Sequence, residues 1–428
     1  MPDAQTSTRT ILVAGGGIAG LSAAVEAAEA GFNVVLVERE PYLGGRVARM
    51  NKYFPKLCPP QCGLEINFRR VRNNPLIRVM TMSEVEKIEG ESSNFTVAIR
   101  VNPRHVNEKC TACGKCSHAA KTEIPNPFDY GLSTVKAAYL PHEFAYPMRY
   151  VIAPEIIGKP EAKEIEAACE YGAVDLDMAP QTVEVKAGAI IWATGWTPFD
   201  TSAISYYGAG KFRNVISNVV MERLASANGP TKGSISRPSD GKPVKKIAFV
   251  QCAGSRDENN LAYCSGVCCL ASLKQATYLL EQDPDAGVSI FYIDIRALGR
   301  NEAFFNKVRE DKRVTLVKGK AGEITENPET GMVSVQVEDQ ETGIILRDEF
   351  DLVVLAAGMV PSTASQRIPV EATYDQAGFL LTGGTPGILG AGCVRSPADV
   401  SASVQDATAA VLRAIQACKR PPAQAQRA

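Results

Sequence analysis

The chain has 428 residues, of which 45% are hydrophobic and 22% charged, the profile of a globular protein with about three domain-sized units. Its 46 basic and 47 acidic residues give a formal net charge of −1, which excludes a protein held on nucleic acid or an anionic membrane by its overall charge. No apolar run approaches the roughly 20 residues of a membrane-spanning helix, and residues 1–9 contain no apolar signal core.

A predicted strand, helix and second strand open the chain in the order of a dinucleotide-binding βαβ unit. Residues 11–14 predict a buried strand, residues 21–30 an alanine-rich helix, and residues 34–37 the second strand. The connection between the first strand and the helix matches G-x-G-x-x-G, which permits a tight turn, the approach of a pyrophosphate to the helix N-terminus and close helix–strand packing. An acid at the end of the second strand can accept a hydrogen bond from a ribose hydroxyl. The predicted cradle residues are Gly15, Gly17, Ile18, Ala19, Gly20, Glu38 and Arg39.

Several later segments resemble those of flavoproteins with two dinucleotide-binding domains. Gly45 and Arg46 match the Gly-Gly-Arg extension of these proteins, and an apolar strand ends in the Ala-Thr-Gly sequence at residues 193–195. Residues 353–358 repeat the strand pattern, and residues 387–392, followed by a predicted helix, resemble the C-terminal flavin-contacting segment. The resemblance implies FAD. It adds the candidate contacts Gly45, Arg46, Val85, Ala193, Thr194, Gly195, Gly392 and Cys393, the last of which stands where most relatives have an aspartate.

A second βαβ unit is expected to open after a hinge rich in glycine, serine and proline over residues 224–243. Residues 245–250 predict its first strand. The following residues, 251–256, lack the glycines that a nicotinamide nucleotide would need at this position. We therefore do not expect a nicotinamide site.

Twelve cysteines at short spacings favour metal ligation or redox chemistry over structural disulfides. Cys110, Cys113 and Cys116 form C-x2-C-x2-C, the run that wraps an iron–sulfur cluster in bacterial ferredoxins together with a cysteine from a second run. The segment around Cys169 is similar to the tail of such a second run, and Cys169 would be that fourth ligand. The positions that would hold a second cluster are Ala120, Lys159, Ala162 and Ile165. We predict a degenerate ferredoxin module with one [4Fe–4S] cluster, with zinc and free thiols as the alternatives.

A second group of cysteines follows the opening strand of the second unit. Cys252, Cys264, Cys268 and Cys269 are separated by eleven, three and no residues. Adjacent cysteines seldom pair with each other, and a helix N-terminus favours thiolates, so the four could surround a compact cluster. The spacing leaves the alternative of buried core cysteines open.

A further pair, Cys58 and Cys62, follows the first flavin-binding segment. The intervening Pro59 and Pro60 stiffen the connection. The pair could be redox-active, could neighbour a cluster beside the flavin, or could belong to a structural loop.

With these motifs, the sequence resembles the A subunits of heterodisulfide reductases and, more closely, those of quinone-interacting membrane-bound oxidoreductase (Qmo) complexes. The matching segments are residues 15–20, 54–57, 126–132, 251–258 and 263–269, together with the insert that opens at Cys110. The resemblance implies that Cys252, Cys264, Cys268 and Cys269 ligate a cluster near FAD, so that two [4Fe–4S] clusters are expected.

The resemblance also implies an α/β fold, that of a thioredoxin-reductase-like flavoprotein with two Rossmann-type domains and an inserted degenerate ferredoxin module. We expect an FAD-binding domain in three parts over residues 1–104, 179–225 and 351–428. The insert is expected over residues 105–178 and the second Rossmann-like domain, with its cysteine cluster, over residues 244–350.

The function that the resemblance implies is that of a flavin/iron–sulfur oxidoreductase, an electron-transfer subunit between the quinone pool and adenylylsulfate reductase in sulfur metabolism. Its implied partners are a haem-bearing membrane subunit together with a second flavin/iron–sulfur subunit. We expect a cytoplasmic protein, peripheral to the membrane through these partners and without membrane insertion of its own. A homodimer is possible by the same resemblance.

Two departures separate the chain from the heterodisulfide reductase proteins, which usually have an extra N-terminal domain and further ferredoxin motifs. Here the glycine fingerprint begins at residue 15 and one insert cluster is expected, which favours the Qmo type. The alternatives are an electron-bifurcating subunit of the heterodisulfide reductase type, a thioredoxin-reductase-like disulfide reductase that uses Cys58 and Cys62, and a flavoprotein in which FAD has a mainly structural role.

Overall fold

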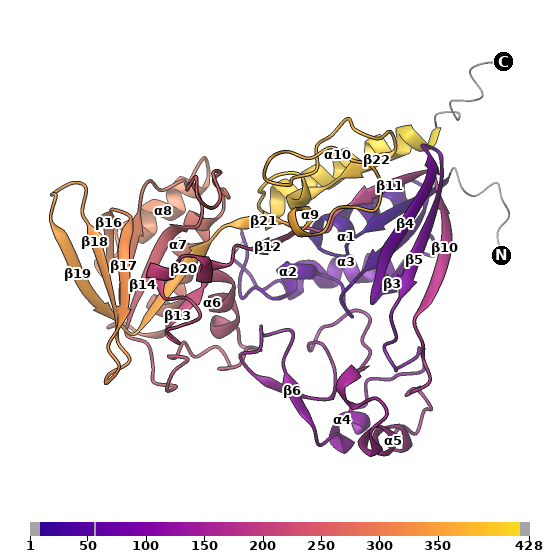
Figure 1. Cartoon of the computed structure of the whole chain (residues 1–428), viewed down its shortest axis with the longest axis horizontal. Coiled ribbons are helices and arrows are strands. Elements are labelled where there is room, and N and C mark those ends of the chain that lie inside the picture. Colours follow the sequence, from indigo (N-terminus) through magenta and orange to yellow (C-terminus); the bar gives the residue numbers. More distant parts are fainter. Residues whose placement is uncertain (1–8, 55–56, 420–428) are drawn as a thin grey trace. The chain divides into compact units, whose positions relative to one another are not determined.

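The computed structural model describes residues 9–54 and 57–419, which divide into two compact units (Figure 1). Unit 1 contains residues 9–196, 361–396 and 400–419, and unit 2 contains residues 197–360 and 397–399. The chain crosses between the units through β12 (Trp196–Pro198) and β21 (Met359–Pro361), which pair with each other. Residues 1–8, where we expect no signal core, and Pro55 and Lys56 of the matching segment 54–57 lie outside the described residues.

A five-stranded parallel sheet in the order β22-β11-β1-β2-β3 is the centre of unit 1. Both faces of the sheet are covered, and most of its strand residues are apolar. The strands are β1 (Thr10–Ala14), β2 (Asn33–Glu38), β3 (Ile77–Thr81), β11 (Ala189–Trp192) and β22 (Ile388–Gly390).

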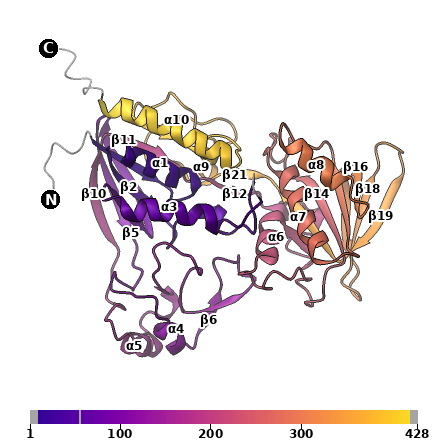
Figure 2. The same cartoon turned by 180° about the vertical axis from the view of Figure 1, so that it is seen from behind.

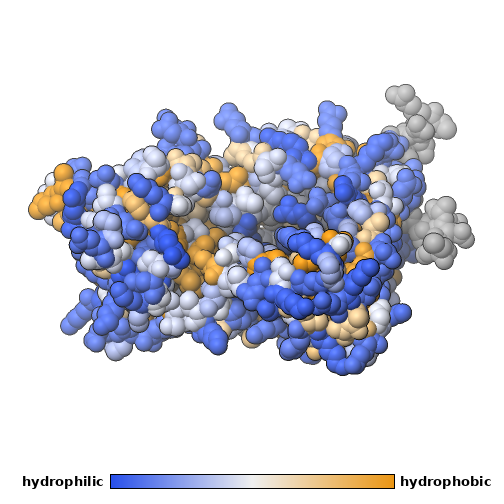
Figure 3. Space-filling model, turned by 60° about the horizontal axis from the view of Figure 1, so that its bottom comes forward, coloured by the Kyte–Doolittle hydropathy of each residue, from blue (hydrophilic) through white to orange (hydrophobic). Residues whose placement is uncertain are grey.

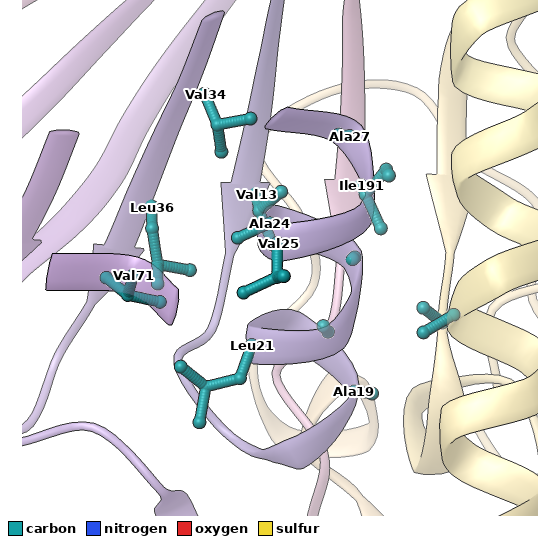
Figure 4. Packing of buried hydrophobic residues seen from close by; sticks show 14 of the residues in the cluster. Val13, Ala19, Leu21, Ala24, Val25, Ala27, Val34, Leu36, Val71 and Ile191 are labelled. Carbon is teal, nitrogen blue, oxygen red and sulfur yellow. The ribbon is translucent and has the colours of Figure 1, made fainter. Parts of the chain in front are cut away.

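Helices cover one face of this sheet (Figure 2). They are α1 (Ile18–Glu29), α3 (Gln61–Asn73) and α10 (Val400–Lys419). Figure 4 shows Leu21 and Val25 of α1 packed between strand residues and Val71 of α3. The other face packs against the antiparallel sheet formed by β4 (Ser83–Glu91), β5 (Asn94–Val101) and β10 (Gln181–Ala187).

An insert enters unit 1 after β5 and leaves it before β10. Its two ends meet at an antiparallel bridge between Val106 and Val174, and the Asn107 N–H donates to the Ala173 carbonyl at 2.8 Å. Its elements are α4 (Lys115–Ala119), β6 (Glu123–Pro125), β7 (Thr134–Lys136), β8 (Ala138–Tyr139), β9 (Val151–Ile152), η2 (Pro154–Ile156) and α5 (Pro160–Ala167). Five of its eleven buried core residues are alanines and none is aromatic, so this core is small.

Unit 2 has its own five-stranded parallel sheet, in the order β13-β20-β14-β15-β16. These strands are β13 (Val215–Ser217), β14 (Lys246–Ala253), β15 (Gly287–Tyr292), β16 (Val314–Lys318) and β20 (Leu352–Ala357). The helices are α6 (Asn218–Ala225), α7 (Cys268–Gln282) and α8 (Asn301–Arg309).

A three-stranded antiparallel sheet completes unit 2. It consists of β17 (Ala321–Glu326), β18 (Val333–Glu338) and β19 (Ile345–Phe350). β19 is an edge strand, and Ile344 and Ile345 at its start are 58% and 64% exposed. Figure 3 shows apolar side chains at the left edge of the molecule, over this end of unit 2.

Two predicted domain boundaries are corrected by the structure. Residues 197–225, predicted within the flavin domain, belong to unit 2. There β13 pairs with β20, and a buried ion pair joins α6 to α7, with Glu222 Oε1 and Lys274 Nζ 2.9 Å apart. Residues 351–360, predicted in the C-terminal flavin part, contain β20, a central strand of unit 2.

The predicted hinge at residues 224–243 is also corrected. It lies within unit 2, where Arg237 is 5% exposed and its guanidinium lies 3.2 Å from Asp240 and 3.7 Å from Asp351. Glycine, serine and proline here form turns on a packed domain. The crossings between the units lie at residues 196–197 and 360–361, with a brief return to unit 2 at residues 397–399. No helix formed by the described residues is long and apolar enough to cross a bilayer.

Candidate functional site

The glycine-rich connection from β1 to α1 forms a cradle at the N-terminus of α1. Gly15 has a φ of +107°, a region that favours glycine, and a Cβ on Gly20 would overlap the Gly15 carbonyl oxygen. A Cβ on Gly17, in contrast, would meet no atom within 4 Å. Gly17 is the N-cap residue of α1, and the first N–H groups of a helix have no intrahelical partner, so open space at this position suits a pyrophosphate.

Glu38 is placed to complete this cradle. It is 8% exposed at the end of β2, where Oε2 accepts the Gly16 N–H at 2.6 Å and Oε1 accepts the Glu40 N–H at 2.7 Å. Burial raises the pKa of its carboxyl from 4.5 to about 7, because the two backbone hydrogen bonds offset only part of the lost hydration. The neighbouring Arg39 is exposed.

The raised pKa of Glu38 predicts a pH-dependent stability of the FAD-free protein. Between pH 4.5 and pH 7 the folded chain retains a proton that the unfolded chain releases, so stability falls as pH rises through this window. We expect this group to lower the free energy of unfolding by up to about 3 kcal/mol across the window. Urea unfolding at both ends of the window should show the fall, and Glu38→Gln should remove it.

The control for this prediction is Glu91→Gln, which changes an exposed acid at the end of β4 in the same unit. It should keep the full pH dependence. An equal fall in stability for the wild type and Glu38→Gln would contradict the assignment of the slope to Glu38.

Gly45 and Arg46, at the start of α2 (Gly45–Ala48), lie beside the cradle. A Cβ on Gly45 would be 2.9 Å from the Gly17 Cα. The Arg46 Nε donates to the Trp196 carbonyl at 2.6 Å, its guanidinium lies 4.7 Å from the Trp196 ring centroid, and its Nη1 donates to the Tyr130 hydroxyl at 3.4 Å. Tyr130 belongs to the insert, so the insert contributes to this part of the flavin-binding unit.

The Ala-Thr-Gly segment and the C-terminal segment meet the same cradle. A Cβ on Gly15 would overlap the Ala193 carbonyl, and one on Gly392 would lie 2.9 Å from the Ala19 Cβ at the start of α1. Exposed Thr194 accepts a hydrogen bond from the Ser362 hydroxyl at 2.7 Å, and the Gly195 carbonyl accepts from the Ser362 N–H at 3.1 Å. The remaining predicted contacts are the half-buried Ile18 and Val85, the latter packed in the core between β4 and the central sheet.

Asp406 of α10 is a residue that the sequence motifs did not reveal. Its Oδ2 accepts the Gly392 N–H at 2.7 Å and its Oδ1 pairs with Arg395. Cys393, which replaces the usual aspartate, lies 3.8 Å from the Ser403 hydroxyl instead. The only sequence signal for Asp406 is an acid within the last predicted helix. That signal is too weak to single it out, because the contact joins a loop to a helix more than ten residues later.

The first cysteine group gathers in the insert. Ala112 and Gly114 have φ values of +57° and +84° and bend the loop between Cys110 and Cys116. Burial raises the pKa of the Cys116 thiol to about 11, and Cys110, Cys169 and Cys113 each raise it further. The Ala173 N–H donates to Cys169 Sγ at 3.2 Å. Cys169 thus lies near enough to Cys116 to affect the pKa of its thiol, although it is more than fifty residues later in the chain; its role as the fourth ligand stays a prediction.

The second cysteine group gathers at the β14–α7 connection of unit 2. Cys252 has a φ of +56°, where the register of β14 with β20 shifts. Such backbone strain in a non-glycine residue persists at functional sites when the surrounding structure holds it. Burial raises the pKa of the Cys268 thiol, and so do its neighbours Cys269, Cys252 and Cys264. The Gly266 N–H donates to Cys264 Sγ at 3.3 Å.

The connection between β14 and α7 is much longer than the glycine-rich turn of unit 1. Residues 15–17 suffice between β1 and α1, whereas residues 254–267 separate β14 from α7. The longer loop places Cys264 near Cys252 and puts Cys268 and Cys269 in the first turn of α7. Thiols therefore occupy the helix N-terminus that a Rossmann unit offers to phosphate.

Each quartet offers four cysteines, the donor set of an iron–sulfur cluster. Burial and the neighbouring thiols raise the pKa of Cys116 in the first quartet and of Cys252 and Cys268 in the second, and iron–sulfur clusters are held by four cysteine thiolates. Residues 9–54 and 57–419 contain no group of three or more His, Cys, Asp or Glu arranged to hold a metal ion. Ligation of a cluster or of zinc by these thiols therefore stays a prediction.

Cys58 and Cys62 lie on either side of the start of α3, near the Tyr53 ring. Burial raises the pKa of the Tyr53 hydroxyl, and Cys58, to which it is hydrogen-bonded, raises it as well. Cys58 is half-buried and Cys62 is exposed, and both are free thiols. Cys62 lines a surface groove of about 660 Å³ together with Glu29, Glu65, Arg69 and Arg70 of the same unit. None of the cradle residues lines this groove, so the pair's redox role stays a prediction.

Sequence comparison relates the chain to known oxidoreductases. Residues 10–54 match the family model of FAD-dependent oxidoreductases. The chain is 38% identical over 424 residues to the iron–sulfur A subunit, form 2, of the CoB–CoM heterodisulfide reductase of Methanopyrus kandleri, covering 96% of this chain and 64% of that protein. It is 36% identical over 419 residues to the A subunit of the H2:CoB–CoM heterodisulfide,ferredoxin reductase of Methanothermobacter marburgensis, covering 94% and 63%.

A third relative is the A subunit of the ferredoxin/F420H2-dependent CoB–CoM heterodisulfide reductase of Methanosarcina acetivorans. It is 36% identical over 437 residues, covering 96% of this chain and 53% of that protein. The chain therefore spans between about half and just under two thirds of the length of these relatives.

Solved structures confirm the expected fold class. The thioredoxin reductase of T. acidophilum matches with a TM-score of 0.52 at 15% identity, covering 95% of this chain and 98% of that chain. The bacillithiol disulfide reductase Bdr of Bacillus cereus matches with a TM-score of 0.53 at 13% identity, covering 96% and 98%. At these identities the likeness concerns the fold alone, which is a thioredoxin-reductase-like α/β fold with two Rossmann-type sheets.

Proposed function

We propose that this chain, which is similar to the heterodisulfide reductase relatives along nearly its whole length, is a flavin/iron–sulfur oxidoreductase subunit that transfers electrons. The observation that supports the proposal most strongly is the second cysteine quartet. Cys252, Cys264, Cys268 and Cys269 surround the end of β14 and the start of α7, which a pyridine nucleotide would otherwise occupy. A unit built this way favours single-electron transfer over hydride transfer.

The residues of unit 1 would bind and orient FAD. The N–H groups at the start of α1 would hold the pyrophosphate over Gly17, and the Glu38 carboxylate would accept a hydrogen bond from a ribose hydroxyl. Arg46 is held against Trp196 and Tyr130, so its position is set before the cofactor binds. When bound, FAD supplies a centre that exchanges two electrons and can release them singly to clusters that accept one.

The two quartets would bind one [4Fe–4S] cluster each. In the insert, Cys110, Cys113, Cys116 and Cys169 would supply the four thiolates, and backbone N–H groups such as that of Ala173 would stabilise their charge. In unit 2, Arg256 donates a hydrogen bond to Cys252 and would stabilise the negative charge of the thiolates in that quartet.

At a finer level, we propose a Qmo-type complex. The chain would relay electrons between the quinone pool and adenylylsulfate reductase, and its partners would be a haem-bearing membrane subunit together with a second flavin/iron–sulfur subunit. The internal support is the insert, which provides ligands for one cluster where a two-cluster module would provide eight cysteines. The partners would make the contact with the membrane.

A heterodisulfide-reductase-type complex is the second candidate, favoured by the names of the relatives described above. The Qmo-type and heterodisulfide-reductase-type proposals are distinguished by identifying the electron acceptor that the purified complex reduces. Oxidation of reduced complex by adenylylsulfate reductase supports the Qmo type, and oxidation by a heterodisulfide supports the other.

Iron and sulfide analysis of anaerobically purified protein tests the proposal itself. We expect about eight irons and eight sulfides per FAD, with two reduced-cluster EPR signals. NADPH should not reduce the flavin, because the pyrophosphate site of unit 2 is replaced by the cysteine loop. Iron-free protein, or flavin reduced by NADPH through disulfide exchange at Cys58 and Cys62, would overturn the proposal in favour of a disulfide reductase.

A further inference from the structure

The loop between β15 and α8 presents an apolar side chain to solvent in a basic surrounding. Leu298 is 81% exposed, the highest value among the large hydrophobic residues that the structure describes as exposed. Arg296 and Arg300 flank it and are exposed as well. We refer to Arg296, Leu298 and Arg300 as the Leu298 surface. Single exposed apolar residues are common, so the surroundings must decide whether this one has a role.

Asp294 connects the Leu298 surface to the second cysteine quartet. The Cys269 thiol lies 3.7 Å from the Asp294 carbonyl oxygen. The Asp294 carboxylate pairs with Arg256 at 2.5 Å and with Arg296 at 3.6 Å. Leu298 follows Asp294 by four residues, a span of at most about 14 Å even when fully extended. This loop is therefore a short route from the Cys269 thiol to solvent.

The charge of this segment is positive, although that of the whole chain is slightly negative. Residues 293–309 contain four basic and two acidic side chains, and one of the acids, Asp294, is already bound by two arginines. Arg300 is exposed, and Arg296 is exposed as well although it pairs with Asp294, so both contribute to a net positive charge at the surface of this segment. Opposite charge speeds the encounter of partners and orients them.

We propose that the Leu298 surface is a docking site for an acidic protein with an exposed one-electron redox centre. Leu298 would fill the apolar centre of the contact, and Arg296 and Arg300 would pair with carboxylates around it. One electron would pass between the partner's centre and the cluster held by the quartet, so that one is oxidised as the other is reduced and no bond forms or breaks. This inference rests on the proposed function, since it requires a cluster at the quartet.

The test uses the anaerobically purified holoprotein and an acidic two-cluster ferredoxin as the probe. Calorimetry at low and at high ionic strength measures its affinity for the wild type, for Arg296→Glu/Arg300→Glu and for Leu298→Ala. We expect the charge-reversed variant to bind at least about tenfold more weakly at low ionic strength and to lose most of the salt dependence. Leu298→Ala should weaken binding at both ionic strengths.

The matched control is Ile345→Ala/Arg347→Glu on β19, which changes an exposed apolar and a basic side chain on a strand that contains none of the quartet. It should bind the ferredoxin as the wild type does. Iron content, flavin spectrum and thermal unfolding of all variants should match the wild type, so a loss of affinity would not reflect misfolding.

Two results would overturn the inference while leaving the proposed function intact. One is full iron content with ferredoxin affinity unchanged in both surface variants. The other is binding of NADPH that Arg296→Glu/Arg300→Glu abolishes, which would make the loop a nucleotide site. Iron-free wild-type protein would instead defeat the proposed function.

Discussion

A Gly20→Ala variant is expected to lose FAD binding and most of the stability of unit 1. The added methyl would overlap the Gly15 carbonyl oxygen, at a distance far below the 3.0 Å that Cβ atoms keep from other heavy atoms. Because this oxygen belongs to the backbone, it cannot move aside as the end of a flexible side chain could. The cradle can relieve the overlap only by separating α1 from β1, which opens the largest apolar cluster of the unit. We expect a loss of more than about 4 kcal/mol, a large part of the stability of an ordinary domain. Urea unfolding and the ratio of FAD to protein measure both effects.

Gly17→Ala is the matched control in the same turn. A Cβ at Gly17 meets no atom within 4 Å, and its φ of −71° suits any residue. We expect the FAD-free variant to unfold within about 1 kcal/mol of the wild type. FAD affinity should still fall, because the methyl would occupy the space through which the pyrophosphate approaches the helix. A stable, FAD-replete Gly20→Ala protein would contradict the packing argument.

A Cys169→Ser variant is expected to lose one cluster and to loosen the insert. Iron should fall from about eight to about four per chain, because a serine hydroxyl is a poor substitute for the fourth thiolate. The apolar core of the insert consists mainly of alanine and other small side chains, so bound metal should contribute much of its stability. Hydrogen exchange over residues 105–178 should rise sharply while that of unit 2 stays unchanged.

The complementary variant is Cys252→Ser, which should remove the other four irons. Hydrogen exchange of the insert should then stay as slow as in the wild type. Cys418→Ser is the control, since Cys418 is a buried thiol of α10 in neither quartet, and it should retain all the iron. If Cys169→Ser keeps its full iron content, or if both serine variants lose the same cluster, the assignment of two independent quartets is wrong.

The predicted elements of unit 1 agree closely with the structure because their signals are local. The apolar run at residues 11–14 lies in β1, the alanine-rich segment in α1, and the second strand ends at Glu38 as the motif requires. The strand at the start of the second βαβ unit is likewise confirmed as β14. Each of these elements is specified by residues that are neighbours in sequence.

The crossings between the units could not be found in the same way. Strand β13 is a member of unit 2 because it pairs with β20, more than a hundred residues later, and nothing in its own composition indicates that partner. The turn-rich segment around Arg237 resembled a hinge because glycine, serine and proline mark turns on packed domains as well as linkers. Domain membership is decided by strand order, which depends on long-range pairing.

In the candidate site, too, the features with local sequence signals were predictable and the long-range contacts were not. The spacing of Cys110, Cys113 and Cys116 and the count to Cys169 predict a quartet. In the structure the other three cysteines lie near enough to Cys116 to raise the pKa of its thiol, and their role as ligands stays a prediction. The support of Arg46 by Trp196 and Tyr130 and the contact of Asp406 with Gly392 were not predicted. These contacts join segments that no motif connects.

The amino-acid sequence alone therefore determined the chemistry: a dinucleotide cradle, two sets of four cysteines, and the loss of the second glycine turn. These features follow from residue type and short spacing, which act through local backbone geometry. Only the tertiary structure decided where the two units divide, which distant side chains support the cradle, and that Asp294 links the second quartet to an exposed basic loop. Those features depend on the packing of segments that are far apart in the chain, and this packing cannot be predicted from local sequence preferences.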